Sequence, residues 1–211
     1  MRWTFGVESL PQARTIASLL RSVTGLVLSV EAPHAALERL IAALRGAEAE
    51  LRGLIPPASV PRVGGNAAAE GRAYIDHSHD IGAYNPCFPE YDIQVDGDRA
   101  AGTVTFPVAY EGPPGIVHGG FLAVFFDSVM QHHNCDVGVA GKTTSLTVNY
   151  RRPTPLLTEL RFEVERSVAE RRIVSDARLL ADGVVLCDAQ MSAVAGDRAK
   201  LPEVSPRKGE A

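Results

Sequence analysis

A single carboxylate, Asp127, follows six consecutive apolar residues in the stretch HGGFLAVFFDS (118–128), which begins with a His-Gly-Gly turn. An ionised carboxylate is costly to bury unless it is paired. The flanking apolar residues cover most of the surface of a helix, which favours a carboxylate that faces a partly desolvated cleft. Such a group is suited to act as a general base or nucleophile. The alternative is an ordinary helix start followed by a solvated or capped Asp127, and spacing alone does not decide between the two.

The His-Gly-Gly turn is a second candidate for chemistry. If a helix begins near Gly119, its free N–H groups and positive dipole end form an oxyanion site, and Gly119 and Gly120 allow a ligand to approach closely. Asp127 lies eight residues further on, which is about 12 Å along a helix. One reacting carbonyl cannot contact both, since each contact must be about 3 Å. Either the two features are unrelated, or a second copy of the chain supplies the Asp through a two-fold contact.

The elements that must position these residues follow from the spacing of apolar side chains. The run from 121 to 133 is too long and does not alternate, which predicts a helix that is buried nearly all round. Alternating segments at 91–95, 99–106, 142–152, 159–168, 171–181 and 184–195 predict strands, with hairpin turns at Asp96-Gly97 and Asp182-Gly183. The predicted fold is therefore α+β, a curved antiparallel sheet around one long central helix.

The N-terminal part has a different pattern. Apolar residues recur at helical spacing from 8 to 53, with a break at Ala32-Pro33, which predicts a helical hairpin. Prolines and glycines dominate 55–71, as is typical of a linker. We predict an N-terminal helical hairpin at 1–54, a linker at 55–84, the main domain at 85–196 and a polar tail at 197–211.

The segment KTTSLTVNYRR (142–152) is rich in hydroxyl groups. Strict alternation along a strand places four polar residues on one face, Thr143, Ser145, Thr147 and Asn149. The other face receives Thr144, Leu146, Val148 and Tyr150. The polar face suits either a binding site or ordinary solvation, and solvation is the simpler account of Thr147.

The run GPPGIVHGGFLAVFFDS, followed by KTTSLTVNYRRP, resembles the hotdog-fold acyl-CoA thioesterases of the PaaI-like family. The resemblance covers about residues 85–195, and its strongest motif is His-Gly-Gly with an acid nine residues after the His. It implies a hotdog fold and hydrolysis of an acyl-CoA or acyl-carrier thioester. The partners expected from it are the thioester substrate and further copies of the chain, as a homodimer or a dimer of dimers.

The resemblance also implies roles for individual residues. Asp127 matches the catalytic acid, which activates water or attacks the thioester carbonyl, and Thr143 matches the hydroxyl that positions the water or nucleophile. Gly119 matches the glycine whose N–H polarises the carbonyl, while His118 shapes the turn and assists. In the family the Asp and hydroxyl come from one subunit and the glycine N–H from its partner, in agreement with the 12 Å separation estimated from the helical rise.

Substrate-binding roles are expected for Gly120, Ser128, Thr144, Arg151 and Arg152. The two arginines could pair with coenzyme A phosphates, because guanidinium donors match phosphate oxygens, although adjacent arginines at a strand end are more often solvated.

The sequence departs from the family pattern at two positions. Residues 111–114, Glu-Gly-Pro-Pro, offer no amide where some relatives have Asn or Gln, and Ser128 stands where many relatives have an acid. The missing amide puts assistance to the leaving group in question.

Two histidine clusters, His77-Ser-His79-Asp80 and His132-His133-Asn-Cys135-Asp136, contain metal-type ligands. Neither has a structural-zinc spacing, and adjacent histidines on a helix point about 100° apart. We therefore expect no metal and no cofactor, and His132 could instead line the cleft, five residues past Asp127.

Composition excludes several other classes of protein. The 211 residues are 45% hydrophobic and 22% charged, which is typical of a globular chain. A net charge of −4 argues against binding to nucleic acid or anionic membrane. No apolar run is long enough to span a bilayer, and the N-terminus lacks a secretory pattern. Three widely spaced cysteines indicate reduced thiols, so we expect a cytoplasmic location.

Two other functions remain open. One is a non-catalytic hotdog module that binds acyl-CoA or lipid, and the other is an enoyl-CoA hydratase or dehydratase. Retention of Asp127 favours hydrolysis over the first. The pair His118 and Asp127 only loosely imitates the acid and base of the second.

Overall fold

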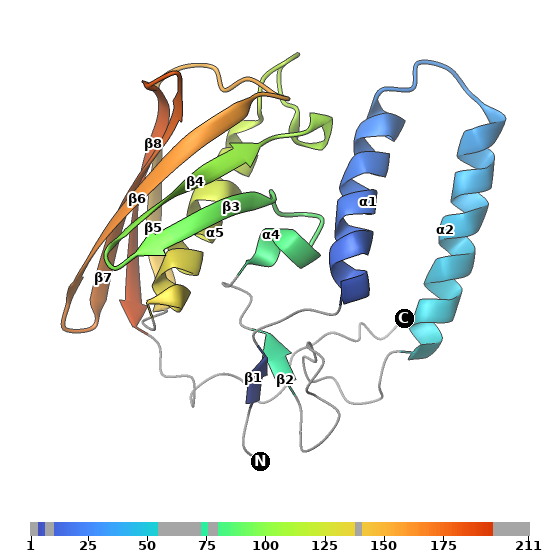
Figure 1. The fold of residues 1–211 in the computed structure, drawn as a ribbon. Coiled ribbons are helices and arrows are strands. Elements are labelled where there is room, and N and C mark those ends of the chain that lie inside the picture. The colour runs from blue at the N-terminus through green and yellow to red at the C-terminus, as the bar shows by residue number, and fades with distance from the viewer. Residues whose placement is uncertain (1–3, 7–10, 55–72, 76–79, 138–140, 196–211) are drawn as a thin grey trace.

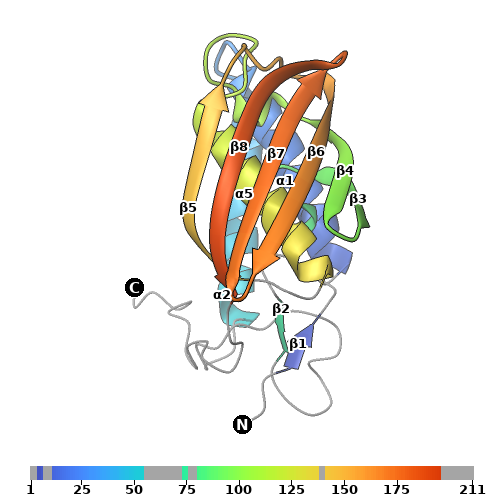
Figure 2. The ribbon, with the colours of Figure 1, turned by 90° about the vertical axis from the view of Figure 1, so that its left-hand side faces the viewer.

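Six antiparallel strands form one curved sheet that wraps around a single long helix, α5 (Figures 1 and 2). The computed structural model describes residues 4–6, 11–54, 73–75, 80–137 and 141–195. The strands lie in the order β3-β4-β6-β7-β8-β5. Their bounds are β3 Tyr91–Asp96, β4 Arg99–Thr105, β5 Gly141–Tyr150, β6 Glu159–Ala169, β7 Arg172–Ala181 and β8 Val184–Ala195, and α5 spans Gly119–Asp136. This is the predicted hotdog fold.

Both predicted hairpins are present, and one turn is shifted by a residue. Asp182 and Gly183 are the central residues between β7 and β8, with φ values of 48° and 77°, and positive φ at both positions is typical of a tight hairpin turn. Between β3 and β4 the central residues are Gly97 and Asp98, not the predicted Asp96 and Gly97, because Asp96 pairs with Arg99, and only Gly97 has a positive φ, 56°.

The core lies between the concave face of the sheet and α5. Four apolar α5 side chains, Phe125, Phe126, Val129 and Met130, are fully buried. Phe125 stacks edge-on against Phe162 of β6, with ring centroids 5.3 Å apart. The predicted apolar run therefore forms the central helix. The middle and the C-terminal end of α5 are buried in the core. At the start of the helix, His118 and Gly120 are exposed.

The predicted helical hairpin consists of α1 (Pro11–Leu28) and α2 (Ala35–Leu54). Arg21 attaches α1 to the main domain: its guanidinium is buried, donates to the Gly82 carbonyl at 2.8 Å and pairs with Glu90 at 2.5 Å. In the predicted linker, residues 81–84 form the short helix α4 (Ile81–Tyr84), and its first three residues are buried. The remaining elements are η1 (Val108–Tyr110) and the parallel pair β1 (Thr4–Gly6) and β2 (Ala73–Ile75).

The described helices include none that is long and apolar enough to cross a membrane.

A buried histidine lies near the C-terminal end of α5. His133 is fully buried, and its Nε2 lies 2.8 Å from the Gly97 carbonyl oxygen. Since a carbonyl only accepts, Nε2 carries the hydrogen. Burial lowers the pKa of His133 below its ordinary value, an effect that the Gly97 hydrogen bond opposes and nearby Arg166 reinforces. The folded protein therefore favours the neutral imidazole.

We predict that His133 makes the protein less stable in mild acid. Below about pH 6.5 the unfolded chain binds a proton at His133 more readily than the folded chain does. The free energy of unfolding therefore decreases as the pH is lowered. Urea unfolding of the native chain and of His133→Asn at about pH 7.5 and about pH 5.5 checks this. The variant should lose less stability on acidification. His34→Asn, which changes an exposed histidine at the start of α2 and keeps a capping side chain, is the control. Equal losses in the native chain and His133→Asn would contradict the prediction.

Candidate active site

The structure brings Asp127 and Thr143 together. Asp127 lies in the middle of α5 on the side that faces the edge strand β5, and its Oδ1 accepts a hydrogen bond from Thr143 Oγ1 at 2.8 Å. Both side chains are half-buried. A carboxylate held by one hydroxyl at the edge of the core retains acceptor capacity for a water molecule or a substrate atom.

A β-bulge in β5 aims Thr143 at the helix. The pairing of β5 with β8 shifts between Thr143 and Ser145. Beyond this shift Leu146 and Val148 are the half-buried residues, and three polar residues are exposed, Ser145, Thr147 and Asn149. The predicted common face for Thr143, Ser145, Thr147 and Asn149 is therefore wrong. An extra residue at a bulge reverses the alternation of side chains.

Gln131 completes the hydrogen bonding of this pair and was not predicted. Its Nε2 donates to Thr143 Oγ1 at 2.7 Å and to the Gly141 carbonyl at 3.0 Å. Because an amide nitrogen only donates, Thr143 accepts from Gln131 and is left to donate its own hydrogen to Asp127. The available signal was spacing, since Gln131 is four residues after Asp127 and so lies on the same face of the helix.

The His-Gly-Gly turn forms the N-terminus of α5. His118 is the N-cap, and its Nδ1 accepts from the Gly120 N–H at 3.0 Å. Its carbonyl accepts from Phe121 and Leu122. Of the first helical N–H groups, that of Gly119 has no acceptor within the described residues, so it is the one available to a ligand. Use of the Gly120 N–H by the cap removes it from the predicted contact with substrate.

Tyr150, at the end of β5, covers Gly119. Its hydroxyl donates to the Gly119 carbonyl at 2.8 Å. A Cβ at position 119 would lie 3.2 Å from the tyrosine ring, which is tighter than an ordinary contact. Tyr150 is 56% exposed and therefore has room to adjust.

Within one chain Gly119 and Asp127 remain apart. They occupy the first and ninth positions of α5, so about 12 Å of helix separates them. The local geometry thus supplies a carboxylate with its hydroxyl at one place and a free N–H at another.

The other predicted substrate-binding residues are held by internal contacts. Ser128 is buried and donates to the Val124 carbonyl at 2.7 Å, so its hydroxyl does not face the site. Thr144 is exposed at the bulge and donates to the Ser192 carbonyl at 3.0 Å. These contacts leave neither hydroxyl directed toward Asp127.

The two arginines after β5 are exposed. Arg151 forms an ion pair with Asp188, and the Arg151 hydrogen bond lowers the pKa of the Asp188 carboxyl. Arg152 donates to the Val185 carbonyl at 3.2 Å. Both guanidinium groups keep further donors for an anion, because each carries five N–H groups.

His132 packs on the β3 side of α5, away from β5. Its Nδ1 lies 3.1 Å from the hydroxyl of Tyr91, and burial raises the pKa of Tyr91 strongly, so this tyrosine stays protonated. Among the described residues no group of three His, Cys, Asp or Glu side chains could hold a metal ion. His77 and His79 lie outside the described residues.

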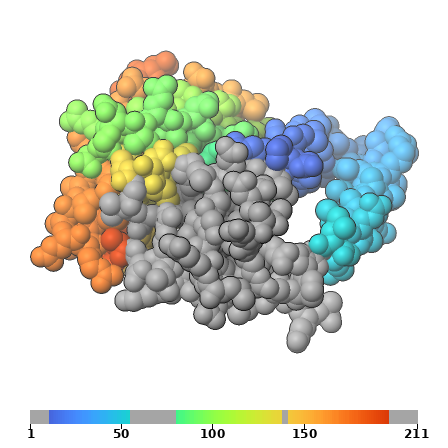
Figure 3. All heavy atoms as spheres, turned by 60° about the horizontal axis from the view of Figure 1, so that its bottom comes forward, coloured from blue at the N-terminus to red at the C-terminus, as the bar shows by residue number. Residues whose placement is uncertain are grey.

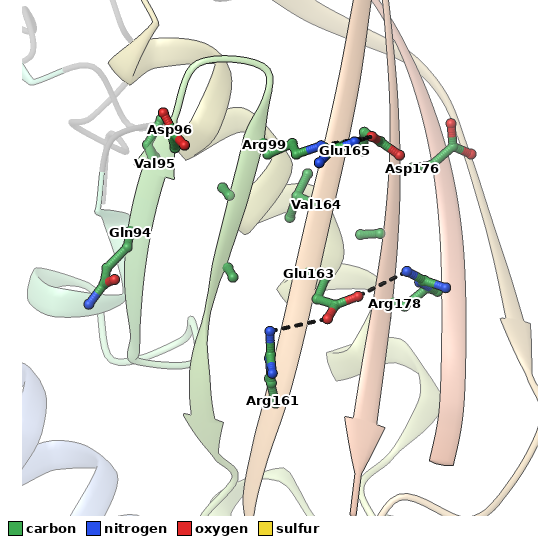
Figure 4. Close-up of a pocket in the computed structure, with 13 residues that line it drawn as sticks. Gln94, Val95, Asp96, Arg99, Arg161, Glu163, Val164, Glu165, Asp176 and Arg178 are labelled. Atoms are coloured by element: carbon green, nitrogen blue, oxygen red, sulfur yellow. Dashed lines mark hydrogen bonds and ion pairs between the residues drawn. The ribbon is translucent and has the colours of Figure 1, made fainter. Parts of the chain in front are cut away.

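The outer face of the sheet carries an open groove of about 860 Å³ over β3, β4, β6 and β7 (Figure 4). Five of its charged side chains pair with one another: Glu163 accepts from Arg178 at 2.9 Å and lies 3.3 Å from Arg161, and Arg99 pairs with Glu165 at 3.0 Å. Asp127 and Thr143 are not among its lining residues. This groove is therefore separate from the candidate active site.

Comparison with solved structures places the fold among thioesterases. A crystal structure of a thioesterase superfamily protein is 28% identical, with a TM-score of 0.70, and the match covers 91% of this chain and 98% of that one. A Streptococcus mutans protein bound to acetyl-CoA is 15% identical over 52% of this chain and 90% of that one, with a TM-score of 0.49. The Escherichia coli PaaI protein of the phenylacetic acid degradation operon is 17% identical over 51% of this chain and 80% of that one, with a TM-score of 0.47.

No protein-family model matches the chain. The chain thus resembles a thioesterase superfamily protein along nearly its whole length, as its motifs predicted.

We predict that Thr143 and Gln131 are energetically coupled. Thr143→Val leaves the Gln131 donor without its hydroxyl partner and should cost about 1–3 kcal/mol of unfolding free energy, whereas Thr143→Ser keeps the hydroxyl and should cost less. Because Gln131→Leu removes the donor itself, the double variant should lose about 1 kcal/mol less than the sum of the single losses. Urea unfolding of the native chain, Thr143→Val, Gln131→Leu and the double variant measures this coupling, and additive losses would contradict it.

Proposed function

We propose that this protein hydrolyses an acyl-CoA or acyl-carrier thioester. The observation that carries the proposal is the hydrogen bond from Thr143 to Asp127 at the start of the edge strand β5. A carboxylate oriented by a hydroxyl is the arrangement that general-base or nucleophilic catalysis needs. The likeness to a thioesterase superfamily protein along 91% of the chain supports the choice of substrate class.

In the proposed reaction Asp127 acts in one of two ways. As a base it removes a proton from a water molecule while the water oxygen attacks the thioester carbonyl. As a nucleophile it attacks the carbonyl itself and forms an anhydride, which water then hydrolyses. In both cases the carbon–sulfur bond breaks and the thiolate leaves with the proton that the water molecule has lost, so the products are the free acid and the thiol. Thr143, held by Gln131, keeps one carboxylate oxygen in place so that the other can face the substrate.

The oxyanion formed at the carbonyl needs a donor, and we assign this role to the Gly119 N–H at the positive end of α5. This donor would come from a second copy of the chain, because about 12 Å of helix separates Gly119 from Asp127 in the same copy. The complete site would then exist only in a homodimer, with His118 fixing the turn through its cap on Gly120.

Arg151 and Arg152 are the proposed contacts for coenzyme A phosphates. They directly follow Tyr150, which contacts Gly119, so they lie at the same end of β5 as the proposed oxyanion donor. Their exposure leaves room for a phosphate, and Arg152 lacks an ion-pair partner among the described residues.

The first prediction for this site concerns the carboxylate. Asp127→Asn should lower kcat/KM for thiol release by about 100-fold or more, because the amide can neither accept a proton nor attack the carbonyl. Thiol release from short, long and aromatic acyl-CoAs measures the effect and identifies the preferred acyl group. Unchanged kcat/KM in a folded variant would remove Asp127 from the mechanism. Binding of acyl-CoA by the native chain without release of thiol would indicate a binding module instead.

The second prediction concerns the backbone donor. Gly119 is the first helical residue of α5, where proline is tolerated, and the extended backbone of His118 (φ −64°, ψ 131°) suits a residue before proline. Gly119→Pro therefore removes the N–H with little change to the helix. It should lower kcat by about 100-fold to 1,000-fold, the usual effect of losing one oxyanion donor. Gly119→Ala adds a similar steric contact with Tyr150 but keeps the N–H, and it should retain most activity. Equal losses in both variants would contradict the role of the N–H.

The third prediction tests whether two subunits share a site. Asp127→Asn and Gly119→Pro subunits, each inactive alone, should recover activity when they are co-expressed as a hybrid dimer. One site of the hybrid then carries both defects and the other carries none. Failure of a purified hybrid to recover thiol release would mean that each site is built within one chain.

A further inference from the structure

The helical hairpin exposes a large aliphatic surface. Ten large side chains of α1 and α2 are between 36% and 75% exposed: Ile16, Leu19, Leu20, Leu26, Val27, Leu28, Ile41, Leu44, Leu51 and Leu54. Leu28 lies two helical turns after Arg21, on the side of α1 that docks to the main domain, so we call the other nine residues the apolar hairpin face. None of them belongs to the proposed active site.

The spacing of these residues is that of helices that pack lengthwise. On α1, Ile16, Leu19 and Leu20 recur at steps of three and four, as do Leu37, Leu40, Ile41 and Leu44 on α2. Such a pattern forms a stripe along one side of a helix that a neighbouring helix normally covers. The hairpin covers its own stripes only in part, because Leu37 and Leu40 are half-buried and no residue of α2 is fully buried. Figures 1 and 3 show α2 at the outer edge of the molecule.

The exposed area is large enough for a stable interface. Folded monomers seldom expose a contiguous apolar patch larger than a few hundred Å². Nine aliphatic side chains, about half exposed on average, present on the order of 900 Å², and a stable complex buries about 800 Å² on each partner. The apolar hairpin face alone therefore meets this requirement.

The chemistry of the hairpin points to another aliphatic helix as the partner. Residues 11–54 contain five arginines, four glutamates and no aromatic residue or lysine. A helix that lies on a membrane usually combines a strongly basic face with Trp or Phe, and both features are missing here. Nearly balanced charges around an aliphatic stripe allow the hairpin to pair with itself.

We propose that the apolar hairpin face binds the same face of a second copy of this chain, so that two hairpins form a four-helix arrangement. Arg21 fixes the opposite side of α1 to the main domain through Gly82 and Glu90, which leaves the apolar hairpin face pointing outward. The contact is distinct from the one that would bring Gly119 of a second copy to Asp127, and it does not depend on the proposed activity. If both contacts form, the protein is a dimer of dimers.

The first experiment measures the mass of the full chain by sedimentation at micromolar concentration. Leu19→Glu/Leu44→Glu places two charges in the apolar hairpin face, at side chains 59% and 47% exposed, so the fold should survive, which circular dichroism checks. The mass should fall by a factor of two, from tetramer to dimer if the proposed active-site dimer also forms, and from dimer to monomer if it does not. The control is Leu157→Glu, which changes a 67% exposed leucine just before β6 and should leave the mass unchanged. An unchanged mass in the hairpin variant overturns the proposal.

The second experiment tests which partner covers the apolar hairpin face. Leu19→Lys/Leu44→Lys should also halve the mass, and an equimolar mixture of the Glu and Lys variants should restore it, because opposite charges then meet across the interface. A mixture that stays at half mass overturns pairing between two hairpins. Flotation with phosphatidylcholine and phosphatidylglycerol vesicles tests a lipid surface instead. Vesicle binding by the native chain that the Glu variant loses, without any change in mass, also overturns the proposal.

Discussion

The fixed rise of an α-helix is the constraint on which the proposed chemistry depends. Gly119 and Asp127 sit on one rigid element, eight residues apart, and no side-chain rotation removes the roughly 12 Å between them. The helix is anchored in the sheet by the burial of Phe125, Phe126, Val129 and Met130. The core therefore does more than stabilise the fold, since it also prevents one chain from assembling both halves of an oxyanion site around a single carbonyl.

The second requirement is that a hydroxyl meets the carboxylate, and three elements cooperate to satisfy it. α5 carries Asp127 and Gln131 on one face, the bulge in β5 turns Thr143 inward, and Met191 of β8 lies 3.6 Å from the Thr143 hydroxyl. The direction of the hydrogen bonds follows from Gln131, which can only donate through its nitrogen. A single amide thus fixes which way the threonine hydrogen points. This arrangement lowers the stability of the fold, because the Gln131 carbonyl oxygen is buried without a hydrogen-bond partner among the described residues.

The sequence predicted the architecture because the relevant signals are local and strong. The apolar run at 121–133 gave the central helix, and the two Asp-Gly turns gave the hairpins. Asp127 and Thr143 were predicted as a pair only through the family resemblance. The bulge at Thr143–Ser145 could not be predicted, because it depends on the register against β8 and leaves no mark in the alternation of β5 itself. The internal bonds of Ser128 and Thr144 were hidden for a similar reason, since a serine or threonine hydroxyl that bonds a backbone carbonyl looks the same in sequence as one that faces a ligand.

Arg21 has a consequence for the order in which the protein is made. Its acceptors, the Gly82 carbonyl and the Glu90 carboxylate, lie 61 and 69 residues further along the chain. A ribosome adding roughly 5–20 residues per second synthesises α1 several seconds before either acceptor exists. During that interval the hairpin has no docking site on its own chain, while its aliphatic stripes are already complete. On a polysome, where nascent copies are close together, these stripes would be the first surfaces of neighbouring chains able to meet.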